Sequence, residues 1–187
     1  MAVNTKKEKP FKVSMLDFLG KEAWGIDLGR TAMEKLEKML RDRPEQIINL
    51  DLRGVERLDA SCSREAIANL VRRQRGERCF FLSGVSNQSV RENIDTAFAR
   101  QEMTILLRHG DDYELIGHPL AAHSLQTLGV VEDLGTATAR QVCDKIKGLA
   151  LTACNNRLRD LCEVGLLLRV DGSASSGGKE FAYVAVR

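Results

Sequence analysis

The chain has 187 residues, of which 43% are hydrophobic and 29% are charged, a composition typical of a folded globular protein. Its net charge of +2 gives no overall basic character, which argues against nucleic-acid binding at the level of the whole chain. No apolar run approaches the roughly 20 residues that span a bilayer, and the basic start MAVNTKKEKPFK leads into no apolar signal segment. We therefore expect a cytoplasmic protein without a membrane partner.

Residue spacing gives no indication of a metal site or an active site. The five cysteines are spread widely and no two have Cys-x-x-Cys spacing, which argues against zinc and against a disulfide framework. The motifs GxxxxGKS/T, GxGxxG, HExxH and GxSxG, which mark phosphate loops, dinucleotide sites, zinc sites and nucleophile elbows, are all missing from the sequence. We expect no metal, no cofactor and no catalytic residue, and hence a protein that is not an enzyme.

The N-terminal half alternates short apolar runs with amphipathic segments, which predict strands and helices respectively. The predicted strands are Phe11–Phe18, Ile47–Leu52, Cys79–Leu82, Thr104–Leu107 and Tyr113–Ile116. The predicted helices are Thr31–Arg41, Ser63–Arg75 and Ser89–Arg100, and the glycines at 20, 25 and 29 are expected to break the chain before the first of them. This alternation predicts an α/β sandwich, a mixed sheet covered by helices, over residues 11–118, after a disordered basic segment at residues 1–10.

The segment Ile47–Leu70, IINLDLRGVERLDASCSREAIANL, carries a more specific pattern. An apolar strand contains Asp51, a Gly-Val step follows, and the residues DASC, numbers 59–62, open a helix. This pattern resembles the central strand, turn and helix of STAS domains, the fold of anti-sigma-factor antagonists. The resemblance implies a domain that senses a signal or recruits a partner such as a kinase-like ATPase, and by position it implies Ser61 as the phosphorylation site.

Two other interpretations of this turn stay open. Asp59 or Ser61 can simply cap the helix, since both residue types accept a hydrogen bond from a backbone amide of the first turn. Alternatively, Cys62 can be a reactive thiol, because a helix N-terminus and the nearby Arg64 both favour a thiolate.

The C-terminal part, residues 119–187 after His118-Pro119, predicts three helices followed by two strands. Leu120–Leu134 is the first helix, Thr138 caps the second, and Thr152 caps the third, which Gly165 ends. The segments 166–170 and 181–186 predict an antiparallel pair of strands joined by the Gly/Ser loop DGSASSGGKE. This order predicts a winged helix-turn-helix domain.

The string NNRLRDLCEVGLLLR within that part resembles winged-helix transcription regulators, in which a helix ends in Leu-x-x-Leu-x-x-x-Gly-Leu-Leu/Ile-x-Arg. The matching positions are Leu158, Leu161, Gly165, Leu166, Leu167 and Arg169. The resemblance implies a third helix that enters the major groove of double-stranded DNA and a hairpin wing beside it.

Charge is concentrated locally in this part: between Thr138 and Arg159, five cations stand against one acid, Asp144. Asparagine can pair with adenine, arginine with guanine or phosphate, and lysine with phosphate. The candidate DNA-binding residues are Lys147, Thr152, Asn155, Asn156, Arg157, Arg159 and Lys179. We therefore predict a DNA-binding transcription regulator that acts as a homodimer, because one helix per site gives limited affinity. The alternative is a non-enzymatic protein-interaction module whose winged helix does not bind DNA.

Overall fold

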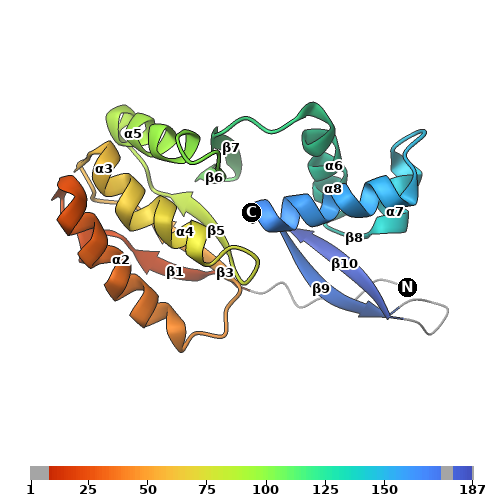
Figure 1. The fold of residues 1–187 in the computed structure, drawn as a ribbon, viewed down its shortest axis with the longest axis horizontal. Helices are drawn as coiled ribbons and strands as arrows, with labels where there is room; N and C mark the ends of the chain where they lie inside the picture. The colour runs from red at the N-terminus through yellow and green to blue at the C-terminus, as the bar shows by residue number, and fades with distance from the viewer. Residues whose placement is uncertain (1–8, 174–178, 187) are drawn as a thin grey trace.

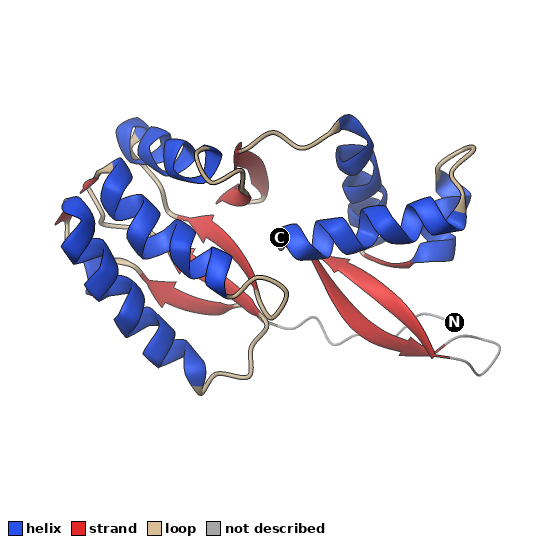
Figure 2. Ribbon diagram, in the orientation of Figure 1, coloured by secondary structure: helices blue, strands red, loops and turns tan. Residues whose placement is uncertain are grey.

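The computed structural model describes residues 9–173 and 179–186, and the side chains of these except for residues 172, 173, 179 and 180. The expected disorder of residues 1–10 therefore falls almost entirely outside the described residues. Two lobes follow one another along the chain: an N-terminal lobe, residues 11–117, and a C-terminal lobe, residues 122–186 (Figures 1 and 2).

The N-terminal lobe is built on a five-stranded sheet in the order β1-β3-β5-β6-β7. Four strands are parallel: β1 (Phe11–Ser14), β3 (Ile47–Asp51), β5 (Cys79–Ser83) and β6 (Thr104–His109). The fifth, β7 (Asp112–Gly117), is antiparallel to β6. The sheet is therefore mixed and mostly parallel, as the alternating sequence pattern predicts.

Helices connect the parallel strands. They are α2 (Gly25–Arg41), a continuous helical segment made of α3 (Ala60–Ser63), a π-helical stretch (Arg64–Ala68) and α4 (Asn69–Arg73), and α5 (Gln88–Ala99). Short elements that the sequence did not predict are α1 (Leu16–Leu19) and the paired strands β2 (Glu22–Ala23) and β4 (Arg57–Leu58). Figure 1 shows the long helices grouped on one side of the sheet.

The expected breaks are confirmed at Gly20, which ends α1, and at Gly25, where α2 begins, but the break at Gly29 is wrong because α2 continues through it. A Cβ added to Gly29 would lie 2.7 Å from the Cβ of Glu65 and 3.0 Å from the carbonyl oxygen of Cys62. This glycine therefore permits close packing of α2 on the segment α3–α4 and does not interrupt the helix. The strand predicted to reach Phe18 also ends early, at Ser14, where α1 follows.

The C-terminal lobe contains three helices and a three-stranded antiparallel sheet. The helices are α6 (Ala122–Leu134), α7 (Ala139–Lys145) and α8 (Leu151–Val164). The strands are β8 (Thr136–Thr138), β9 (Leu167–Ser173) and β10 (Lys179–Ala185), in the order β8-β10-β9. The predicted pairing of the last two strands is confirmed, and β8 is an addition that the sequence did not indicate.

Both faces of the N-terminal sheet are covered, and each by a different part of the chain. Alternate strand residues such as Phe80 and Leu82 pack under the helices. Their neighbours Cys79 and Phe81 belong to a second core, which they share with buried residues of the C-terminal lobe such as Leu158. The apolar run Cys79–Leu82 is thus buried on both sides, and the two lobes pack together through it.

Candidate nucleic-acid interface

The pair of helices α7 and α8 is held by local hydrogen bonds. Thr138 forms the predicted cap of α7: its hydroxyl accepts from the amide of Gln141 at 3.3 Å, and the Gln141 side chain accepts from the Thr138 amide at 2.8 Å. In the turn that follows, the Cys143 thiol donates to the carbonyl of Leu149 at 2.7 Å. The start of α8 is therefore fixed relative to α7.

Helix α8 has one buried and one exposed face. Cys154, Leu158 and Leu161 are buried, and the Cys154 thiol donates to the carbonyl of Ala139 at 3.3 Å. The opposite face exposes four of the predicted DNA-binding residues, namely Thr152, Asn155, Asn156 and Arg159. The helical spacing of Cys154, Leu158, Leu161 and Cys162 predicts one apolar stripe, and the structure buries the first three of these side chains while Cys162 is half-buried.

The beginning of α8 carries no capping side chain, which corrects the expectation that Thr152 caps it. Ala150 occupies the N-cap position, and Thr152 lies one residue inside the helix. The residues from Leu151 to Arg159 include no acid, and Arg140, Lys145 and Lys147 of α7 and the following turn are exposed. Uncapped amides, the positive end of the helix dipole and nearby cations together favour an anion at this end of α8.

The remaining predicted cations differ in exposure and in ion pairing. Arg159 lies 3.8 Å from both Asp160 and Glu163, although its side chain stays 62% exposed. Arg157 is half-buried, and its Nη1 has no hydrogen-bond partner among the described residues. The backbone of Lys179 begins β10, and its side chain lies outside the described residues. Of the two arginines predicted on α8, Arg159 is therefore exposed and Arg157 is half-buried.

The turn before α3 is closed by Asp59. Its carboxylate accepts from the amide of Cys62 at 2.6 Å and from the amide of Gly25 at 3.0 Å, so Asp59 is the cap. The alternative that Cys62 is a reactive thiol is wrong, because burial and then the charge of Asp59 raise its pKa to about 11. Ser61 is half-buried beside this carboxylate, so a phosphate there would share the helix end with a negative charge.

Two exposed apolar side chains that the sequence did not predict as a site lie next to the same turn. Trp24 is 54% exposed and Ile26 is 40% exposed, and Gly25 between them donates to Asp59. The available signal was the chain's single tryptophan, placed in a stretch interpreted as a glycine-broken loop. Exposed large apolar side chains of this kind often mark contact surfaces.

At the carboxyl end of β3, on the sheet edge where α/β proteins often bind ligands, one buried carboxylate is paired with two cations. Asp51 is 5% exposed and lies 2.8 Å from both Lys12 and Arg53. Burial alone would raise the pKa of Asp51, but the hydrogen bonds from Arg53 and Lys12 outweigh it and hold the pKa below the usual value. Across residues 9–173 and 179–186, no three His, Cys, Asp or Glu side chains gather in a way that could hold a metal ion.

The structure is that of a mixed α/β protein, and α8 exposes a polar face that carries no acid in its first half. Among the described helices, none is long and apolar enough to cross a membrane. The sequence matches no family model, and no curated protein matches it.

Proposed function

We propose that the protein is a DNA-binding transcription regulator. In this proposal the C-terminal lobe is a winged helix-turn-helix in which α8 enters the major groove and the β9–β10 hairpin is the wing. The N-terminal lobe is a STAS-like domain that senses a signal or recruits a partner. The observation that carries the proposal is the exposed, acid-free first half of α8, which follows the cations of α7 directly.

The side chains on that surface suit groove reading. Asn155 and Asn156 can each pair with a base edge, and Arg159 can reach a guanine or a phosphate. Lys147 and the free amides at the start of α8 suit the sugar-phosphate backbone. A homodimer would present two such helices to two half-sites and so raise the affinity.

A salt-titrated gel shift with the full chain and a random duplex pool tests the proposal. We expect binding that weakens steeply as salt increases, because each phosphate contact releases counterions. Arg159→Ala and Asn155→Ala should reduce sequence preference, while Lys179→Ala and Lys147→Ala should weaken binding to all sequences alike. Undetectable binding at low salt would exclude the regulator, and equal losses from all four variants would contradict the assigned roles.

A second candidate function is supported by the exposed Trp24 and Ile26. Here the protein is an interaction module whose N-terminal lobe docks on a kinase-like ATPase or another protein, and whose C-terminal lobe does not bind DNA. Trp24 is the only tryptophan, so its fluorescence reports directly on contact at this patch. A blue shift on titration with such an ATPase, lost in Ile26→Ser, together with a negative gel shift, would favour this function over the first.

Whether Ser61 is phosphorylated is a separate question for both candidate functions. Mass spectrometry after incubation with a cognate kinase tests it, with Ser61→Ala as the control. The Asp59 carboxylate at the same helix end favours an unmodified turn, so we expect no modified peptide that spans Ser61.

A further inference from the structure

Helix α6 has one face that the rest of the chain leaves uncovered. Its buried side chains, such as Leu128 and Val131, are on the side that packs against α8 and β10. The opposite face is exposed apart from one half-buried glycine, and its residues are Ala122, Leu125, Gln126, Gly129 and Asp133. Leu125 is 47% exposed, so this face presents a large apolar side chain among small ones.

Gly129 lies in the middle of this face. A Cβ added to it would meet no atom within 4 Å, whereas a Cβ added to Gly29 of α2 would lie 2.7 Å from Glu65. Glycine destabilises the interior of a helix relative to alanine, and no contact within the described residues requires it at position 129. The missing side chain leaves room for the close approach of another helix.

The charges of α6 oppose its own dipole. Glu132 and Asp133 lie in the last turn, which holds no base, and His123 lies in the first turn, which holds no acid and no capping side chain. Glu132 accepts a hydrogen bond from the Tyr113 hydroxyl at 2.5 Å, but Asp133 and His123 are exposed and form no ion pair among the described residues. A second α6 in antiparallel orientation would bring this acidic end beside a positive helix N-terminus.

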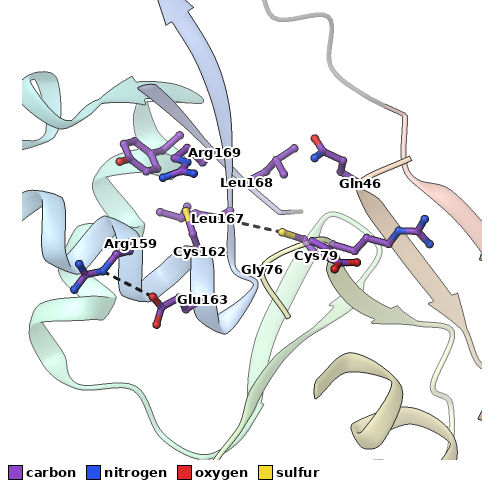
Figure 3. A pocket seen from close by; sticks show the side chains of 12 residues that line it. Gln46, Gly76, Cys79, Arg159, Cys162, Glu163, Leu167, Leu168 and Arg169 are labelled. Carbon is purple, nitrogen blue, oxygen red and sulfur yellow. Dashed lines mark hydrogen bonds and ion pairs between the residues drawn. The ribbon is translucent and has the colours of Figure 1, made fainter. Parts of the chain in front are cut away.

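The N-terminal lobe covers a different part of the C-terminal lobe. The second half of α8 and the start of β9 border a cavity of about 400 Å³ together with the turn Gly76–Arg78 and Cys79 (Figure 3). The arginines that line it come from both lobes and are Arg78, Arg159 and Arg169. The Cys79 thiol donates to the carbonyl of Leu167 at 3.5 Å in the same region. Among the described residues, none from the exposed face of α6 lines this cavity, so the contact between the lobes leaves that face open.

We propose that the exposed face of α6 binds the same face of a second copy of this chain, with the two helices antiparallel. A two-fold axis near the middle of the helix places Asp133 of each copy at the first turn and His123 of the other. It also places Leu125 of each copy against Gly129 and Val130 of the other, which buries both exposed leucines. One contact thus complements the charges at both ends and uses the space at the central glycine.

One pair of short helices makes a small interface, so we expect a dimer that dissociates on dilution. The exposed face of α8 is not part of this interface. The use of this dimer for binding DNA rests on the proposed function, whereas the dimer itself does not.

Sedimentation velocity of the full chain without DNA, over a series of concentrations, tests the dimer. We expect the mass to rise from one chain to two, and Leu125→Ser to weaken the dimer about 30-fold, because a half-exposed leucine is lost from both copies. The matched control is Leu134→Ser, which should leave the dimer unchanged. Leu134 is 37% exposed and lies on the opposite side of the same helix. A chain that stays monomeric, or equal losses in the two variants, would overturn the proposal.

Exchange of charges tests the orientation. Asp133→Lys and His123→Glu should each weaken the dimer about five-fold, and the double variant should restore it. The two positions are about 15 Å apart along one helix, so they can compensate each other only between copies. Both substitutions suit the dipole of α6, so the variants should fold, which circular dichroism checks. A double variant as weak as the single variants would refute the antiparallel pairing.

A gel shift then relates the dimer to DNA. Under the proposed function, Leu125→Ser should lower DNA affinity and Leu134→Ser should not. A chain that dimerises but binds no DNA would leave the α6 interface standing and refute the regulator. A chain that binds DNA but stays monomeric in solution would refute the α6 interface alone, so the two failures are distinguishable.

Discussion

The helices that begin at Ala60 and at Leu151 differ in how their first amides are used. In the N-terminal lobe, the Asp59 carboxylate takes the amide of Cys62 and ties it to Gly25 of α2. In the C-terminal lobe, Ala150 offers no side-chain acceptor to the start of α8. One helix end is closed by the chain itself, and the other remains available to an anion.

The charged side chains of the two lobes show the same contrast. Asp51 is paired with Lys12 and Arg53, and the nearly buried Glu65 with Arg30 and Arg64. On α7 and the turn after it, Arg140, Lys145 and Lys147 form no ion pair within the described residues, and all three are exposed. These two carboxylates of the N-terminal lobe are thus paired within the lobe, whereas the cations around α7 are exposed without an ion pair among the described residues.

The largest expected effect concerns the core that joins the lobes. Phe81 is buried on the sheet face that packs against the C-terminal lobe, so Phe81→Ala should lower the free energy of unfolding by about 3–5 kcal/mol. Urea denaturation measures it. Phe181→Ala is the control, because Phe181 is largely exposed and its loss should cost less than about 1 kcal/mol. Similar costs for both variants would mean that the lobes do not depend on this core.

The next largest effect is expected from removing the Asp59 cap of α3. Asp59→Ala deletes the acceptor for two amides and should destabilise the protein by about 1–2 kcal/mol, with DNA affinity unchanged. Asp59→Asn keeps one oxygen acceptor but turns an amide NH2 towards the other N–H, so it should lose part of this stability. A stability of Asp59→Asn equal to that of the unaltered protein would show that one of the two hydrogen bonds contributes nothing.

A capping side chain at the start of α8 should raise stability, and a negatively charged cap should also lower DNA affinity. Ala150→Ser and Ala150→Asp each supply a cap to α8 and should stabilise the protein by about 1 kcal/mol. Only Ala150→Asp should weaken DNA binding, because it places a negative charge where we assign a phosphate. Equal DNA affinities of the Ser and Asp variants, measured by gel shift, would argue against a phosphate at this end.

The smallest expected effect comes from a surface pair of the N-terminal lobe. The hydrogen bond from Arg91 lowers the pKa of Glu114 to about 2, and His109 adds to this. Since the folded pKa lies below the ordinary 4.5, the pair stabilises the fold above that pH and the contribution is lost as pH falls towards 2. Because Glu114 is about a third exposed, we expect about 0.5–1 kcal/mol. Glu114→Gln should make the acid limb of stability against pH shallower, and an unchanged limb would contradict this.

Local sequence signals predicted many of the elements because their causes are local. The Thr138 cap, the glycine end of α8 at Gly165, in left-handed conformation, and the apolar strands 47–52 and 79–82 each follow from a few neighbouring residues. The polar face of α8 was likewise readable from helical spacing, and all four of its outward residues are exposed. These features require no knowledge of distant contacts.

Other features depended on contacts between segments far apart in the chain. Gly29 was interpreted as a break, since its packing against Glu65 cannot be seen from its neighbours. Arg159 and Glu163 are four residues apart on one helix, so the sequence could have predicted their ion pair. The contact of Arg169 with the ring of Phe181 depends on the pairing of β9 with β10. The apolar run at Cys79–Leu82 predicted a buried strand without saying what buries it.

The sequence by itself therefore determined the order of helices and strands and the polar face of α8, because capping and periodicity act over a few residues. Only the tertiary structure decided that the C-terminal lobe covers the second face of the sheet and that the arginines of both lobes line one cavity. Burial of apolar surface drives that packing without direction, and the partners are chosen by shape and not by sequence distance. The polar face of α8 thus followed from the sequence, whereas its uncapped start, where Thr152 was expected to cap, and the packing of the two lobes were decided by the structure.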